Sequence, residues 1–76
     1  MVEVNIAKFR NATDDLRSLN REFKTCASDK ERQNLADSVN RKLGEYSKYS
    51  CARAKSDDIE SFDRAKITLL NQLETS

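Results

Sequence analysis

Apolar residues recur at helical spacing in the first third of the chain. From about residue 5 to residue 26 they follow one another in steps of three and four residues: Phe9, Ala12, Leu16, Leu19, Phe23 and Cys26. This spacing keeps one face of a helix apolar and predicts a helix over residues 5–26. Asn5 is placed to cap its first turn, and Val4 and Phe9 stand where a hydrophobic pair usually flanks such a cap.

The first residues also allow a different interpretation. Val2, Val4 and Ile6 alternate with the polar residues Glu3 and Asn5, which is typical of a short strand. In that case the helix would begin later, near residues 13–15. Five alternating residues are weak evidence, so the earlier helix start is preferred.

A second helix is expected over residues 29–50. Ser28 and Glu31 form a capping box, in which the serine oxygen accepts from an early amide of the helix. A narrow apolar stripe follows in steps of three and four residues: Leu35, Val39, Leu43, Tyr46 and Tyr49. Gly44 lies inside this stripe and lowers its helix propensity.

A third helix is expected over residues 57–74. Asp57 and Asp58 suit the positive end of a helix dipole. One side of this segment carries a stripe that Ile67 and Leu70 widen: Ile59, Phe62, Lys66, Leu69 and Leu73. It is the most apolar of the three segments.

The expected fold class is therefore all-α, with one helical domain over residues 1–76. Short turns near residues 27–28 and 55–56 favour consecutive antiparallel helices, so we expect a small antiparallel three-helix bundle. The alternative is a helical hairpin in which the second and third segments form one long helix. The core of so short a chain is small, and self-association would complete it.

Composition argues against most catalytic chemistry. The 76 residues include no His, no Pro and one Gly. A Ser-His or Cys-His pair is therefore excluded, and a phosphate-binding loop would need more glycine. The two cysteines are 25 positions apart, too far for a short-spaced zinc motif. We expect a protein that is not an enzyme and that takes no metal, cofactor or small-molecule substrate.

Cys26 and Cys51 predict a reducing environment. The N-terminal residues lack the apolar core of a secretory signal, and no long apolar run predicts a membrane span. Two thiols in such a chain are expected to be reduced and the protein cytoplasmic. A bundle of the expected length would hold the two sulfurs at opposite ends, too far apart for a disulfide.

The apolar stripes of the first and third segments are the first candidate for a functional surface. Such stripes form either an internal core or a contact face for another chain. The thin middle segment offers few aliphatic side chains to cover both of its neighbours. We therefore expect part of this surface to bind another protein or a second copy, and the candidate residues are Phe9, Leu16, Leu19, Phe23, Phe62, Leu69 and Leu73.

Residues 41–55 offer an alternative site. They carry five cations against one carboxylate, with two tyrosines between them, a pattern able to hold phosphates and stack bases. The candidate anion-binding residues are Arg41, Lys42, Tyr46, Lys48, Tyr49, Arg53 and Lys55. The net charge of only +1 and the acidic run that follows weaken this alternative. The sequence thus favours a helical protein–protein interaction module over a binder of nucleic acid or another anionic surface. Such a module would be an accessory subunit, an adaptor or a regulatory inhibitor, of the kind that phages and viruses also encode.

Overall fold

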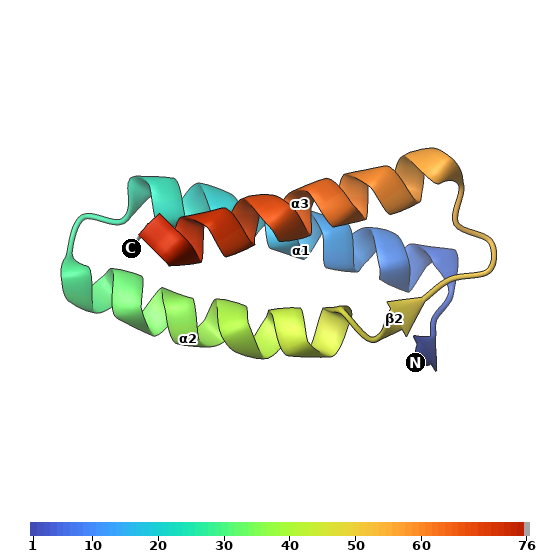
Figure 1. Cartoon of the computed structure of the whole chain (residues 1–76), viewed down its shortest axis with the longest axis horizontal. Coiled ribbons are helices and arrows are strands. Elements are labelled where there is room, and N and C mark those ends of the chain that lie inside the picture. Colours follow the sequence, from blue (N-terminus) through green and yellow to red (C-terminus); the bar gives the residue numbers. More distant parts are fainter. Residues whose placement is uncertain (76) are drawn as a thin grey trace.

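Three helices make up most of the chain in a computed structural model that describes residues 1–75 (Figure 1). They are α1 (Ile6–Thr25), α2 (Asp29–Tyr46) and α3 (Ser56–Thr75). The chain reverses direction after α1 and again before α3, so all three helices run roughly parallel to the long axis of the molecule. The all-α helical bundle expected from the sequence is confirmed. α2 and α3 are separate helices, so the hairpin with one long helix is wrong.

Polar side chains start the first two helices as the sequence indicated. The side-chain oxygen of Asn5 accepts from the amide of Lys8 at 2.8 Å, and that of Ser28 accepts from the amide of Glu31 at 3.2 Å. Each bond satisfies an amide that has no partner within its helix. The first helix therefore begins at Ile6, and the later start near residues 13–15 is wrong.

A small parallel strand pair was not expected. β1 (Val2–Glu3) lies beside β2 (Tyr49–Ser50), with Val2 opposite Tyr49. The amides of Val2 and Val4 donate to the carbonyls of Lys48 and Ser50 at 2.7 and 2.8 Å. The strand interpretation of the N-terminus was therefore right for two residues.

This pairing also explains where α2 ends. The sequence predicted a helix to residue 50, but α2 stops at Tyr46, and the connection to α3 runs through β2. The carbonyls of residues 48 and 50 accept hydrogen bonds from the N-terminal segment and not from amides of a continuing helix. The turn expected at residues 55–56 is thus a nine-residue connection over residues 47–55.

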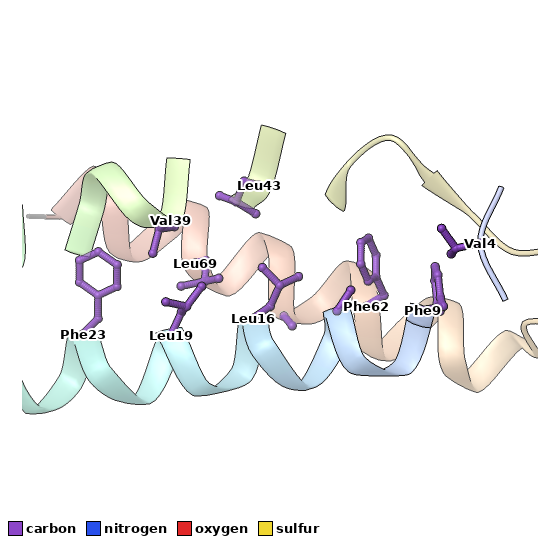
Figure 2. Packing of buried hydrophobic residues seen from close by; sticks show 11 residues of the cluster. Val4, Phe9, Leu16, Leu19, Phe23, Val39, Leu43, Phe62 and Leu69 are labelled. Atoms are coloured by element: carbon purple, nitrogen blue, oxygen red, sulfur yellow. The ribbon is translucent and has the colours of Figure 1, made fainter. Parts of the chain in front are cut away.

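The core lies along the line where the helices meet (Figure 2). α1 packs most extensively against α3, while α2 contacts α1 less and α3 over a short stretch only. The most deeply buried side chains are Leu16, Phe23, Val39 and Leu69, each less than 2 % exposed. At the other end of the core the rings of Phe9 and Phe62 stack with their centroids 4.8 Å apart.

Candidate functional site

The apolar residues proposed from the sequence as a partner-binding face lie inside the molecule. Six of them belong to the buried core, and the seventh, Leu73, packs against it half-buried. The buried ones are Phe9, Leu16, Leu19, Phe23, Phe62 and Leu69. In this conformation they hold the helices together and are not presented to a partner.

A different set of apolar side chains remains exposed on α3. Ile59, Ile67 and Leu70 are 46 %, 56 % and 46 % exposed, whereas Phe62 and Leu69 of the same helix are buried. Ile59 and Ile67 are separated by two steps of four residues, with Asp63 between them, and Leu70 follows three residues later. This spacing places all four on one side of the helix. We call Ile59, Asp63, Ile67 and Leu70 the outer face of α3.

Charged side chains border the outer face. The guanidinium of Arg64 lies 2.9 Å from a carboxylate oxygen of Glu60. The ammonium of Lys66 lies 3.9 Å from Asp63 and 5.4 Å from the centre of the Phe62 ring, so it bridges the outer face and the core. A shallow groove along the helix is lined by Ile59 and Ile67 together with Glu60, Asp63 and Arg64. An apolar strip with a charged border is typical of a protein contact surface.

The residues proposed as an anion-binding site are only partly free to bind an anion. Lys42 donates to a carboxylate oxygen of Asp15 at 2.7 Å, and the Tyr46 hydroxyl donates to the same oxygen. Tyr49 donates to Glu45 at 3.2 Å. Both tyrosines therefore face carboxylates, which repel phosphate. The other four candidates are exposed cations, with Arg41 on α2 and Lys48, Arg53 and Lys55 in the connection to α3.

Asp15 is the centre of a polar cluster between α1 and α2. The hydrogen bonds from Lys42 and then Tyr46 lower the pKa of Asp15 below its ordinary value. Burial, and then the hydrogen bond to Asp15, raise the pKa of Tyr46 far above its ordinary value of 10.0. At neutral pH Asp15 is therefore a carboxylate and Tyr46 a neutral phenol, and the carboxylate accepts hydrogen bonds from both Lys42 and Tyr46.

A cleft beside this cluster has the same acidic character. It lies between α1 and α2 and is lined by Asp14, Asp15, Glu45 and the two tyrosines, with Lys8 at one side. The ammonium of Lys8 already lies 5.5 Å from the centre of the Tyr49 ring. The polar groups that line the cleft thus already interact with one another, and its carboxylates disfavour an anionic ligand.

Both cysteines are free thiols and half-buried. Cys26 follows α1, and Cys51 follows β2 at the other end of the molecule (Figure 1). Across residues 1–75, no group of three cysteine or acidic side chains is arranged to hold a metal ion. Nor does any helix in this part of the chain combine the length and apolar character needed to cross a bilayer.

Comparison with protein-family models, curated proteins and solved structures found no match to this chain.

Sequence reasoning did not identify the outer face of α3 as the exposed surface. A usable signal was present: Ile67 and Leu70 widen the apolar stripe beyond what a core seam of Phe62, Leu69 and Leu73 requires. A helix with more apolar width than its neighbours cover is expected to leave part of it exposed.

Proposed function

We propose that this protein is a small, non-enzymatic helical protein–protein interaction module that binds its partner through the outer face of α3. The observation that supports this most is the exposure of Ile59, Ile67 and Leu70 on one side of a helix whose Phe62, Ala65 and Leu69 are buried. Covering such a strip removes apolar surface from water, which is the main source of binding energy in helix-to-helix contacts. The free thiols favour a cytoplasmic setting for this activity.

The alternative function, binding nucleic acid or another anionic surface through residues 41–55, has weaker support. Lys42 is paired with Asp15, and both tyrosines of the stretch are hydrogen-bonded to carboxylates. Only the exposed cations Arg41, Lys48, Arg53 and Lys55 remain for an anion, and the net charge of the chain is +1. A salt-sensitive affinity for DNA or RNA would be the signature of this alternative.

An affinity comparison tests the proposed function. The wild-type protein, Ile67→Lys and the control Asn34→Lys are each immobilised and exposed to a lysate of the cells that express the protein. Asn34 is exposed on α2, so both variants add one positive charge at a surface position. We expect proteins that bind the wild type and Asn34→Lys to be lost from Ile67→Lys, as identified by mass spectrometry. Recovery of the same proteins on all three would contradict the proposal.

A further inference from the structure

Residues on and beside the outer face of α3 are spaced symmetrically about the middle of the helix. Ile59 and Leu70 stand at equal distances along the helix from the midpoint between Arg64 and Ala65, and so do Asp63 and Lys66. Lys55, just before the helix, and Glu74, near its end, have the same relation to this midpoint. We propose that the partner of the outer face is a second copy of this chain, bound with its α3 antiparallel to the first; this inference rests on the proposed function.

In this arrangement apolar side chains meet apolar ones, and opposite charges meet each other. A two-fold axis at the midpoint places Ile59 against Leu70 of the second copy and Asp63 against Lys66 of the second copy, each twice. Ile67 lies about one helical turn, roughly 4.5 Å along the axis, from the level of Ile59 of the second copy and extends the same apolar cluster. Two apolar clusters thus flank two central ion pairs, and Lys55 faces Glu74 at each end.

Charge disfavours two other ways of pairing the same face. In a parallel pair each side chain meets its own equivalent, so Asp63 lies against Asp63 of the second copy. An antiparallel pair that matches Ile59 with Ile67 also brings the two Asp63 carboxylates together at its centre. Like charges directly opposite each other weaken a contact and select against that register.

Most of the side chains involved are exposed, and Asp63 and Lys66 exchange their ion pair within the chain for ion pairs across the contact. Ile59, Ile67 and Leu70 are about half exposed, and Asp63 has 55 % of its side-chain surface exposed. The side chain of Lys66 is 29 % exposed and its ammonium is 3.9 Å from its own Asp63, so a small movement reaches the opposite carboxylate. A contact of one helix face per copy is small, and we expect a reversible dimer with a dissociation constant of roughly 10–500 µM.

Sedimentation equilibrium with charge-reversed variants tests this inference. Asp63→Lys places two lysines opposite each other at both central layers, and Lys66→Glu places two carboxylates there. We expect the wild type to dimerise reversibly and each single variant to dimerise at least tenfold more weakly. A mixture of the two variants is expected to form a heterodimer at least as tight as the wild-type dimer, because every central pair is then attractive.

Two controls separate the contact from changes in folding. Asp37→Lys makes the same charge change at an exposed position of α2 and is expected to dimerise like the wild type. Circular dichroism melting checks that each variant remains folded. Each single variant lacks the ion pair between Asp63 and Lys66 within one chain, both alone and in the mixture. Tighter association in the mixture therefore reports the contact between chains.

Three results would overturn the inference: a wild type that stays monomeric up to about 1 mM, a dimer that neither reversal weakens, or a mixture no tighter than the single variants. Suppose that the wild type is monomeric and binds a different protein that Ile67→Lys does not bind. This result overturns the second copy as partner and leaves the proposed function standing. A dimer that Ile67→Lys does not weaken counts against both.

Discussion

At the scale of single residues, Asp15 links α1 to α2. Its carboxylate accepts from Lys42 and Tyr46, which are 27 and 31 positions away in the sequence. α2 contributes Val39 and Leu43 to the buried core, with Leu35, Ala36 and Tyr46 packed against it half-buried, and the polar contacts of Asp15 add to this packing. Hydrogen bonds to a charged group stabilise a fold by more than neutral ones do.

Replacing Asp15 by Asn is expected to lower the free energy of unfolding at pH 7 by about 1–2 kcal/mol. The pKa of Asp15 is depressed in the folded state by the bonds from Lys42 and Tyr46. Its contribution is therefore fully present only above the unfolded-state pKa and is lost as the pH falls through the folded-state pKa. Urea unfolding should show a large difference between the wild type and Asp15→Asn at pH 7 and a smaller one near pH 2.5.

The neighbouring carboxylate provides the control for this experiment. Asp14 is exposed, and Asp14→Asn is expected to change the unfolding free energy by less than about 0.5 kcal/mol at either pH. A loss in Asp15→Asn that is the same at both pH values would show that the ionised carboxylate is not what stabilises the contact.

At the scale of whole elements, α2 is the least firmly held of the three helices. α1 and α3 pack together along most of their length, whereas α2 contacts α3 over a short stretch only. α2 also contains Gly44, the one glycine of the chain, which has an ordinary negative φ. A side chain at this position would meet no other atom within 4 Å.

Gly44→Ala is therefore expected to stabilise the protein by about 0.5–1 kcal/mol, because alanine loses less conformational entropy in a helix than glycine does. Thermal or urea unfolding measures the change. The reverse type of change at another exposed position of α2, Ser38→Gly, should cost about 0.5 kcal/mol. A loss of stability in Gly44→Ala would mean that the helix is closely covered at Gly44, contrary to the structure.

At the scale of the whole molecule, most large apolar residues form a central core, and the exposed ones lie at the N-terminus and in a strip on α3. The core occupies the lines of contact between the helices (Figure 2), and the exposed strip of Ile59, Ile67 and Leu70 lies on α3 beside the buried face of that helix. The exposed cations of residues 41–55 are spread over α2 and the connection to α3. Binding is therefore expected to depend on the strip and to be insensitive to these cations.

Reversing two of these cations tests that division. Lys48→Glu with Arg53→Glu should leave the free energy of unfolding within about 0.5 kcal/mol of the wild type, since both side chains are exposed and away from the core. Self-association and partner binding should also be unchanged. Loss of binding in this stable double variant would support the anionic-surface alternative instead.

The three helices and most of the core were predictable because both follow from local spacing. Steps of three and four residues identified Leu16, Leu19 and Phe23 as one face, and Ser28 marked the start of α2. The strand pair and the end of α2 were not predictable in this way. They depend on Val2 meeting Tyr49, a contact between distant parts of the chain that no local pattern reports.

The exposed surface was harder to predict than the fold for a similar reason. Ile59 and Phe62 are both apolar and three residues apart, yet Phe62 is buried under α1 and Ile59 is not. Which of them is covered depends on where the other helices lie around α3. The role of Asp15 was also missed, because its partners belong to a different helix.

A dilution series followed by ¹H–¹⁵N NMR tests most directly whether the outer face of α3 is where this protein binds itself. We expect concentration-dependent shifts at Ile59, Asp63, Lys66, Ile67 and Leu70, with residues 41–54 unchanged. The same spectra of Ile67→Lys should not change with concentration. Shifts that fall mainly within residues 41–54, or a wild-type spectrum independent of concentration up to about 1 mM, would contradict the account.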